Sequence, residues 1–272
     1  MLLIFGNGLL GNYIYNYFKL KMDTNLITRN ELDVLKSYYN LTLYNNIKKI
    51  IEQNKYKYVI NCIGDISKNK KNINEFYILN SYFPIMLSNI CNELNIVLFH
   101  PTTDCVYSGY DDFEYSGNFF PNCIDDYGLS KFLGENINAC VIRTSIIGHE
   151  KYTNKSLVNW ILQNKNKEIN GFTNHLWNGI TCLEYAKFIY NLIINKNYWK
   201  GIKHIGSSYN GQNHISKYEL VKLISDIYEL NINVIPFKTS RNCNRILKLD
   251  ILLDTDLKQQ IKEMKNNYLL NI

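Results

Sequence analysis

The feature that most constrains the fold is a glycine-rich turn between a short apolar strand and a helix. Residues 2–5 are uniformly apolar and predict a buried parallel strand. The turn follows as Gly6-Asn7-Gly8-Leu9-Leu10-Gly11, and residues 12–20 predict a helix. Glycines in this context permit a tight turn and a close approach of the backbone to a pyrophosphate at the helix N-terminus. We expect this turn to bind a dinucleotide through Gly6, Gly8, Leu9, Leu10 and Gly11; a glycine turn without a ligand is the alternative.

The first half of the chain alternates apolar strands with helices. Strands are predicted at residues 25–28, 58–63, 96–100 and 139–145, and helices at residues 41–54 and 74–94, with Pro84 kinking or bounding the second helix. This order predicts an α/β fold with a doubly wound parallel sheet of the Rossmann kind. Ligands bind at the carboxyl ends of such strands. We therefore expect cofactor contacts from the residues that end the third strand, Cys62, Ile63 and Gly64.

The end of the second strand bears on the choice of cofactor. Enzymes that prefer NAD usually carry Asp or Glu there, which binds the ribose 2′-hydroxyl. This chain instead reads Thr28-Arg29-Asn30, and an arginine can pair with a 2′-phosphate. The sequence thus favours NADPH, with NADH as the alternative, and Arg29 and Asp33 as predicted contacts. A solvated surface position is an equally simple interpretation of Arg29.

Residues 99–131 contain the candidate chemistry. Thr103 directly follows the strand at residues 96–100, where the ligand crevice of a parallel sheet is expected. Tyr127 and Lys131 are four residues apart, and a helix places such residues on one face, with Asp125 or Asp126 as its cap. A neighbouring ammonium lowers the pKa of a phenol, which predicts that Tyr127 is a general acid or base. With 22 tyrosines in the chain, this spacing also arises by chance and gains meaning only from its context.

Past residue 148 the pattern changes. Helices are predicted at residues 156–163, 183–194 and 217–230, a strand at residues 202–206, and a polar aromatic loop at residues 171–179. We expect residues 1–148, with a return segment around residues 173–200, to form the cofactor-binding domain. Residues 149–172 and 201–272 are expected to form a smaller α/β lid that binds the substrate over the carboxyl edge of the sheet.

Composition excludes several classes of function. The 272 residues are 46% hydrophobic and 20% charged, which is typical of a globular protein. The net charge of +6 is scattered, so nucleic-acid binding is not expected, whereas an anionic small ligand is compatible with it. Seven cysteines without a CxxC spacing predict reduced thiols in a cytoplasmic protein. Neither a signal peptide, a membrane span nor a metal site is expected.

These motifs together resemble the extended short-chain dehydrogenase/reductases, in particular the dTDP-4-dehydrorhamnose reductase family, over nearly the whole chain. The matching segments are the glycine turn, Thr102-Thr103-Asp104, the helix from Tyr127 to Glu135, and Arg143-Thr144-Ser145. The resemblance implies that Thr103 is a catalytic hydroxyl, that Tyr127 protonates the reduced carbonyl oxygen, and that Lys131 supports both. It also implies that Asn80 lies near the cofactor and that Lys217-Tyr218-Glu219 belongs to the lid.

Within that family the chain is most similar to a branch that acts on UDP-2-acetamido-2,6-dideoxy-hexos-4-uloses. The shared segments are residues 104–109, 143–150 and 171–174. The resemblance implies NADPH-dependent reduction of the 4-ketone to UDP-N-acetyl-L-rhamnosamine. The abundance of Asn, Ile, Lys and Tyr indicates an AT-rich genome and is also similar to that of large DNA viruses. Such a source would place the reaction in the host cytoplasm.

Cys105 departs from the plain reductase pattern, which has Tyr at this position. GDP-fucose synthase and the bifunctional UDP-rhamnose synthases are similar in placing Cys there, which implies proton exchange at the carbon beside the ketone. A thiolate can take such a proton, and a second acid must then act from the opposite face, with Lys155 or His149 as the expected partner. A packed thiol is the alternative role of Cys105.

The expected substrate is a UDP- or dTDP-linked 4-keto-6-deoxy sugar. Its predicted contacts are Thr103, Asp104, Cys105, Trp160, Asn174 and Arg245, the last as a partner for the diphosphate. Two alternatives stay open, a monofunctional dTDP-4-dehydrorhamnose reductase-like enzyme and a non-catalytic NADP-binding regulatory subunit. A homodimer is expected from the resemblance alone.

Overall fold

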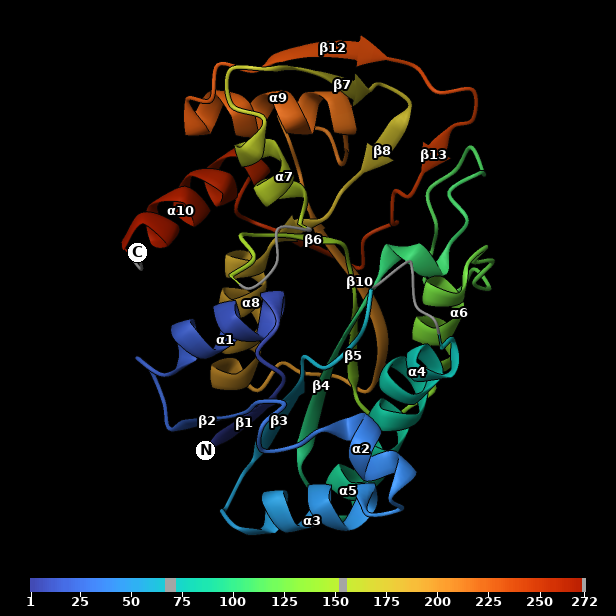
Figure 1. Ribbon diagram of the computed structural model, residues 1–272, viewed down its shortest axis with the longest axis vertical. Coiled ribbons are helices and arrows are strands. Elements are labelled where there is room, and N and C mark those ends of the chain that lie inside the picture. Colours follow the sequence, from blue (N-terminus) through green and yellow to red (C-terminus); the bar gives the residue numbers. More distant parts are fainter. Residues whose placement is uncertain (67–71, 152–155, 271–272) are drawn as a thin grey trace.

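The computed structural model describes residues 1–66, 72–151 and 156–270, and its central element is a seven-stranded parallel sheet (Figure 1). The strand order is β14-β10-β5-β4-β3-β1-β2, and every neighbouring pair is parallel. This architecture confirms the predicted α/β class. The strands span Leu2–Phe5 (β1), Thr24–Ile27 (β2), Tyr58–Asn61 (β3), Val97–Thr102 (β4), Cys140–Arg143 (β5), Gly201–Ser207 (β10) and Ile251–Leu253 (β14).

Helices cover both faces of the sheet, which explains why a central strand such as β1 is apolar without alternation. Leu2 and Ile4 of β1 enter one core with helices α1 (Leu9–Phe18) and α8 (Cys182–Asn195). Leu3 and Phe5 point the other way, into the core under α3 (Leu43–Glu52) and α5 (Phe83–Glu93). All four side chains of β1 are fully buried. The helix α8 packs against α1, so part of the return segment lies in this layer.

The sheet reverses its order between β1 and β3, and the glycine turn lies at this switch point. Gly6 has a φ of +96°, and a Cβ placed on it would lie 2.9 Å from the carbonyl carbon of Cys62. A Cβ on Gly11 would lie 1.9 Å from the carbonyl oxygen of Gly6. Gly8 precedes α1 and has no atom within 4 Å of a Cβ position. The fold therefore requires glycine at positions 6 and 11, whereas position 8 is open toward the crevice where ligands bind.

One predicted helix is divided in the structure, and one short helix was not predicted. Residues 74–94 form α4 (Asn74–Tyr77), a π-helical turn η1 (Ile78–Tyr82) and α5, and Pro84 lies at the start of α5, where its missing N–H is tolerated. Before α3, a short helix α2 (Val34–Tyr39) was not anticipated. Its first turn is capped by the carboxylate of Asp33, which accepts a hydrogen bond from the Lys36 amide at 3.0 Å.

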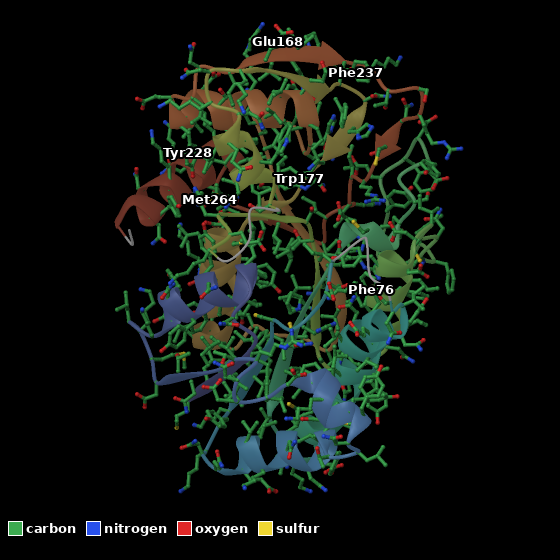
Figure 2. The ribbon with its side chains drawn as sticks, in the orientation of Figure 1. Phe76, Glu168, Trp177, Tyr228, Phe237 and Met264 are labelled. Carbon is green, nitrogen blue, oxygen red and sulfur yellow. The ribbon has the colours of Figure 1, made fainter. Side chains whose placement is uncertain are left out.

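A smaller α/β layer lies beyond the carboxyl edge of the sheet and is called the lid below. It contains the pair β7–β12, the sheet β11-β8-β13 and three helices around a core that includes Trp177 and Met264 (Figures 1 and 2). Figure 2 also marks Glu168 and Phe237 at its far end and Phe76 of α4 in the first layer. Its elements span Leu157–Gln163 (α7), Glu168–Phe172 (β7), His175–Trp177 (β8), Ile215–Ser216 (β11), Lys217–Tyr228 (α9), Asn233–Phe237 (β12), Cys243–Asn244 (β13) and Leu257–Leu270 (α10).

The boundary between the layers differs from the predicted one. We expected all of residues 201–272 in the lid, but β10 and β14 extend the central sheet beside β5. The expected loop at residues 171–179 contains β8. Between the layers, β6 (Ile146–Ile147) pairs with β9 (Ile180–Thr181). The chain passes back and forth between the sheet and the lid. This follows because each strand pairs with a partner distant in the sequence, which local patterns do not encode. No helix in the described ranges combines the length and apolar character required to cross a bilayer.

Gly8 and Gly11, three positions apart in the turn, give a direct test of this geometry. We expect Gly11→Ala to lower the free energy of unfolding by about 3 kcal/mol, because its Cβ overlaps a backbone oxygen that has no room to move. Gly8→Ala is the matched control and should stay within about 0.5 kcal/mol of the wild type. Urea unfolding followed by circular dichroism measures both, and equal midpoints for the two variants would contradict the assignment.

Candidate active site

The carboxyl ends of β1, β3 and β4 bring together the segments that carry the predicted site. A Cβ on Gly64, just after β3, would lie 3.1 Å from Oδ1 of Asn80 and 3.9 Å from Nζ of Lys131. Asn80 accepts a hydrogen bond from the Asp65 amide at 2.8 Å, and its Nδ2 donates to the Asp65 carbonyl and to Oγ of Ser130, both at 3.0 Å. The side chain of Asn80 thus ties the loop after β3 to the helix that carries Lys131.

That helix is α6 (Asp126–Leu133), and its placement brings Tyr127 and Lys131 to the edge of the sheet. Asp125 caps it by accepting a hydrogen bond from the Gly128 amide at 2.7 Å. A Cβ on Gly128 would lie 2.3 Å from the carbonyl oxygen of Cys105, so glycine allows the helix to pack closely on the turn after β4. Lys131 is buried, and its Nζ donates to the carbonyl of Pro101 at 3.2 Å.

Burial governs the protonation of Tyr127 and Lys131. It lowers the pKa of Lys131 to about 8, against the opposing effect of Glu135. The pKa of Tyr127 is raised, first by burial and then by Cys105, while the Thr103 hydroxyl acts to lower it. The spacing predicted that Lys131 would lower the pKa of Tyr127, and this is wrong for the structure described here. Desolvation is the largest influence on the Tyr127 pKa, so Tyr127 is held as a phenol that can donate a proton.

Thr103 and Cys105 lie together in the turn after β4. Oγ1 of Thr103 accepts a hydrogen bond from the Cys105 amide at 3.1 Å and so caps the short helix η2 (Asp104–Val106). The same hydroxyl donates to Oδ1 of Asp104 at 3.1 Å. Sγ of Cys105 lies 3.7 Å from the same Asp104 oxygen and accepts a hydrogen bond from Nη1 of Arg245 at 2.9 Å. Burial and then Asp104 raise the pKa of Cys105 to about 12, so the resting group is a thiol.

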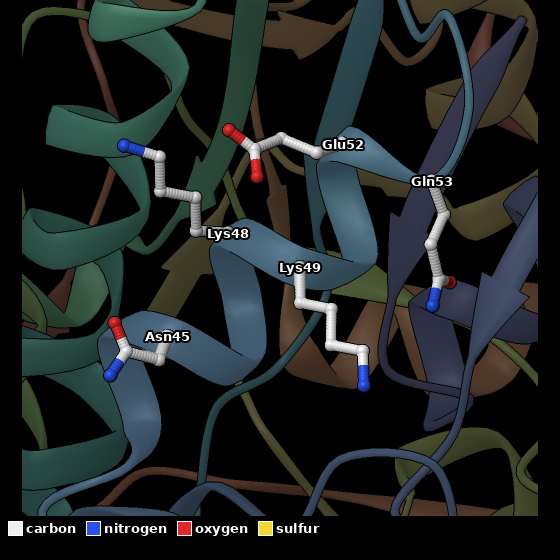
Figure 3. Close-up of a pocket in the computed structure, with 5 residues that line it drawn as sticks. All are labelled: Asn45, Lys48, Lys49, Glu52 and Gln53. Carbon is white, nitrogen blue, oxygen red and sulfur yellow. The ribbon is translucent and has the colours of Figure 1, made fainter.

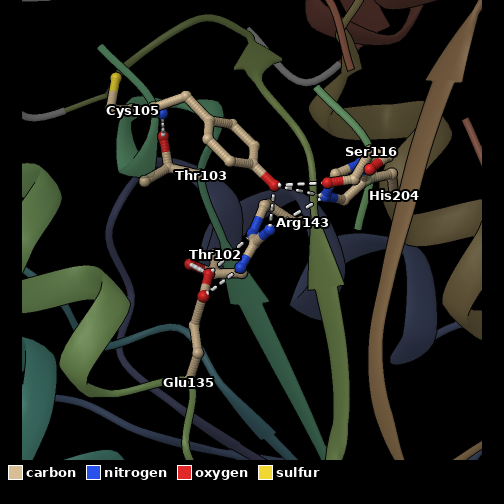
Figure 4. A network of polar contacts seen from close by, with 8 residues as sticks. Thr102, Thr103, Cys105, Ser116, Glu135, Arg143 and His204 are labelled. Atoms are coloured by element: carbon tan, nitrogen blue, oxygen red, sulfur yellow. Dashed lines mark hydrogen bonds and ion pairs between the residues drawn. The ribbon is translucent and has the colours of Figure 1, made fainter. Parts of the chain in front are cut away.

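A buried network of polar groups lies behind this turn (Figure 4). Glu135 forms an ion pair with Arg143, and its Oε1 accepts hydrogen bonds from Thr102 at 2.6 Å and from Nε of Arg143 at 3.1 Å. Nη1 of Arg143 donates to the hydroxyl of Tyr107 at 2.6 Å and lies 3.0 Å from Nε2 of His204. In the sequence, Arg143 and Glu135 stand out only as parts of motifs. The signal that was available is an opposite charge pair within two apolar segments, which requires mutual pairing.

His149 is not brought to the turn that holds Cys105. Its Nδ1 lies 2.9 Å from the hydroxyl of Tyr13, its Nε2 lies 3.0 Å from the hydroxyl of Tyr228, and its ring stacks on Tyr268. Burial lowers its pKa to about 4. Because both ring nitrogens are engaged between α1 and the lid, the expectation that His149 is an acid partner of Cys105 does not fit this position. Lys155, the other expected partner, lies outside the described residues.

Three further predicted contacts are engaged elsewhere or exposed. The Asn174 side chain binds the backbone at Thr239 and Arg241 and so braces a lid loop. Trp160 is half exposed on α7. Nε of Arg29 donates to Asp33 at 3.0 Å, and the Arg29 side chain is 76% exposed, which leaves it accessible to a ligand at the end of β2.

Two surface grooves in the described residues lie away from Thr103. One runs along the outer face of α3 and is lined by Asn45, Lys48, Lys49, Glu52 and Gln53 (Figure 3). Figure 1 places α3 at the end of the first layer opposite the lid. A second follows α9 and α10. Neither carries the residues that the sequence predicts for catalysis.

A comparison with known protein families identifies the family of this chain. The RmlD substrate binding domain profile matches residues 1–248. The chain belongs to this family. A comparison with curated proteins finds no match.

Solved structures with the same fold include two reductases and a dehydratase. A dTDP-4-dehydrorhamnose reductase from Clostridium acetobutylicum is 20% identical with a TM-score of 0.81, and the match covers 100% of both chains. A dTDP-4-dehydrorhamnose reductase from Bacillus anthracis in complex with NADP is 19% identical with a TM-score of 0.82, covering 98% of this chain and 99% of that one. A dTDP-glucose 4,6-dehydratase from Bacillus anthracis in complex with NAD is 14% identical with a TM-score of 0.74, covering 100% and 97%. The family member described here therefore has the Rossmann-like fold of these enzymes.

The lowered pKa of Lys131 predicts a cost in stability. The folded state holds this ammonium less favourably than the unfolded chain does, by on the order of 3 kcal/mol below pH 8, where both states are protonated. We expect Lys131→Met to raise the free energy of unfolding at pH 7 by up to this amount. The gain should shrink as the pH rises from 8 toward 10.5, because the wild-type side chain then loses its proton.

Chemical denaturation at pH 7 and pH 10 measures this effect. Lys49→Met, at an exposed position on α3, is the matched control and should show neither the gain nor its pH dependence. A Lys131→Met variant that is less stable than the wild type at pH 7 would contradict the prediction.

Proposed function

We propose that this protein reduces the 4-ketone of a nucleotide-linked 4-keto-6-deoxy sugar with NADPH. The observation that carries the proposal is the grouping of Lys131 beside Gly64, with its Nζ on the Pro101 carbonyl, and of the Tyr127 phenol beside the Thr103 hydroxyl, at the carboxyl edge of the sheet. Membership of the RmlD substrate binding domain family supports it, as does the name dTDP-4-dehydrorhamnose reductase carried by similar structures.

The residues at the switch point fit a dinucleotide. Gly8 is open toward the crevice at the N-terminus of α1, where a pyrophosphate would meet free amides. Gly64, Asn80 and Lys131 would lie beside the nicotinamide ribose, with Cys62 and Ile63 lining the strand end. The reduced nicotinamide would supply the hydride. The exposed side chain of Arg29 can pair with the 2′-phosphate of NADPH and so favours this cofactor. The Bacillus anthracis reductase is in complex with NADP. NADH is the alternative.

The chain's own residues supply the acid chemistry. Thr103 would hydrogen-bond the carbonyl oxygen, and the phenol of Tyr127 would protonate the oxygen at C4 as hydride arrives. The raised pKa of Tyr127 suits this direction because the proton is still present at neutral pH. Lys131 would hold the ribose and stabilise the phenolate that Tyr127 leaves behind.

The finer assignment is to UDP-2-acetamido-2,6-dideoxy-hexos-4-ulose as substrate and UDP-N-acetyl-L-rhamnosamine as product. It is supported by the segments at residues 104–109, 143–150 and 171–174. The alternative is a dTDP-4-dehydrorhamnose reductase-like activity without epimerisation. The family resemblance supports the proposal of a homodimer. The pattern of the second half supports a lid that binds the nucleotide sugar, and the AT-rich composition supports a large DNA virus as the source.

Epimerisation at C3 before reduction is proposed on Cys105. The 4-ketone acidifies the C3 proton, the thiolate of Cys105 would take it, and an acid would return a proton to the other face. With His149 engaged elsewhere, Lys217 joins Lys155 as a candidate for that acid. Lys217 lies at the start of α9 with Nζ 4.8 Å from the Trp177 ring centre, and burial lowers its pKa against the opposing effects of Asp104 and Cys105.

Reduction is tested by cofactor absorbance. The purified protein should oxidise NADPH when given the UDP-4-keto-6-deoxy acetamido sugar, more efficiently than it oxidises NADH. Tyr127→Phe should reduce kcat by at least about 100-fold, because it removes the proton donor while keeping the ring. Tyr110→Phe, at a half-exposed tyrosine stacked with Arg241, is the matched control.

No cofactor oxidation with either the UDP or the dTDP substrate would reject the reductase proposal. NADP binding without turnover, together with co-purification of another enzyme, would instead favour the regulatory subunit.

Epimerisation is tested by running the reaction in heavy water. We expect one deuterium at C3 of the product with the wild-type protein, and a loss of C3 deuterium with Cys105→Ser while cofactor binding is unchanged. Cys123→Ser is the matched control, since this thiol lies outside the Arg245 contact. Reduction without deuterium at C3 in the wild type would reject the role of Cys105 and leave the simple reductase.

A further inference from the structure

An arginine of the lid, Arg245, contacts Cys105 in the turn after β4. Nη1 of Arg245 donates to Sγ of Cys105 at 2.9 Å, and Nε of the same guanidinium is buried with no hydrogen-bond partner among the described residues. Arg245 was expected to bind the substrate diphosphate. The structure instead directs one of its donors at the sulfur that the proposed epimerisation uses.

The backbone around Arg245 fixes this contact. The Arg245 amide donates to the Leu176 carbonyl at 3.3 Å, and the preceding amide, of Asn244, donates to the Gly109 carbonyl at 2.6 Å. Gly109 has a φ of +79°, and a Cβ on it would lie 3.0 Å from Cγ of Arg245. Glycine at position 109 therefore lets the arginine pass from the lid strands to the turn after β4.

Charged and polar groups surround the sulfur from both layers. Asp104 and Asp125 raise the pKa of Cys105, whereas Arg245 and the Thr103 hydroxyl lower it. From the lid, Lys217 interacts electrostatically with Asp104 and Arg245, and Cys243 interacts with both Lys217 and Arg245. Of these groups only Arg245 is a permanent cation that touches Sγ, because a guanidinium does not lose its proton in proteins.

We propose that Arg245 is a positioning residue for Cys105: its guanidinium holds the sulfur at the sugar-facing turn and stabilises the thiolate that proton exchange at C3 requires. The proposal rests on the epimerisation proposed above. The proton balance is simple. The thiolate takes the C3 proton and becomes the thiol, the second acid protonates C3 on the other face, and solvent resets both groups.

A role in diphosphate binding makes different demands on the same side chain. A guanidinium that binds diphosphate would change the apparent KM for the nucleotide sugar and leave the chemistry of the free thiol unaltered. A guanidinium that stabilises the thiolate changes that chemistry with no substrate present. The two roles are therefore separable in the free enzyme.

The first experiment measures labelling of Cys105 in the substrate-free protein by mass spectrometry. We expect Arg245→Gln to slow alkylation by iodoacetamide at pH 8.5 by at least about tenfold, which corresponds to a pKa change of one unit. It should also lower the ratio of the iodoacetate rate to the iodoacetamide rate, since a local cation favours the anionic reagent and the ratio is insensitive to access. Arg245→Lys should recover part of both effects.

Controls and outcomes separate this proposal from the proposed function. Arg241→Gln, at a lid arginine stacked on Tyr110, should label like the wild type, as should Cys123 in every variant. An unchanged reagent ratio at Cys105 in Arg245→Gln overturns the proposal, as does unchanged C3 deuterium incorporation in that variant when the wild type incorporates it. If the wild type incorporates none, the epimerisation fails, whereas the labelling result still decides whether Arg245 governs the thiol.

Discussion

The site depends on the buried ion pair between Glu135 and Arg143. Both residues are at most 3% exposed, and removing either would leave an uncompensated charge in the interior. The pair joins the end of α6 to the end of β5, and its hydrogen bonds reach Thr102 on β4 and His204 on β10. Thr102 precedes the catalytic candidate Thr103, and Glu135 follows Lys131 by one helical turn. The network therefore fixes the two segments that carry the proposed chemistry relative to each other.

Burial around this network also determines protonation in the site. His204 accepts from Arg143, and burial together with Arg143 lowers its pKa to about 4, so it is a neutral partner. Burial also keeps Tyr127 a phenol, keeps Cys105 a thiol and brings the pKa of Lys131 to about 8. Of Tyr127, Cys105 and Lys131, Lys131 has the pKa nearest to neutral. A bound dinucleotide would therefore meet a site whose proton donor is already loaded.

Sequence patterns predicted the parts of the molecule that local chemistry decides. The glycine turn, the strand that ends before Thr103 and the helix with Tyr127 and Lys131 lie where expected, because turn geometry, burial and helical periodicity are local properties. The position of β10, the engagement of His149 and the contact of Arg245 with Cys105 depend on pairing between residues more than 50 positions apart. The prediction that the pKa of Tyr127 is lowered was also wrong, since the spacing of residues does not reveal how deeply a side chain is buried.

The proposed reduction and the proposed proton exchange would make opposite demands on neighbouring groups. Protonation at C4 would require Tyr127 to keep its proton, whereas exchange at C3 would require Cys105 to lose one, and burial favours the protonated form of both. A cation shared by the two groups would ionise both and remove the acid that reduction needs. Arg245 contacts the sulfur, whereas the group that most lowers the pKa of Tyr127 is the neutral hydroxyl of Thr103. A lid arginine directed at one of two adjacent acids is thus a physical means of ionising Cys105 while Tyr127 remains a phenol.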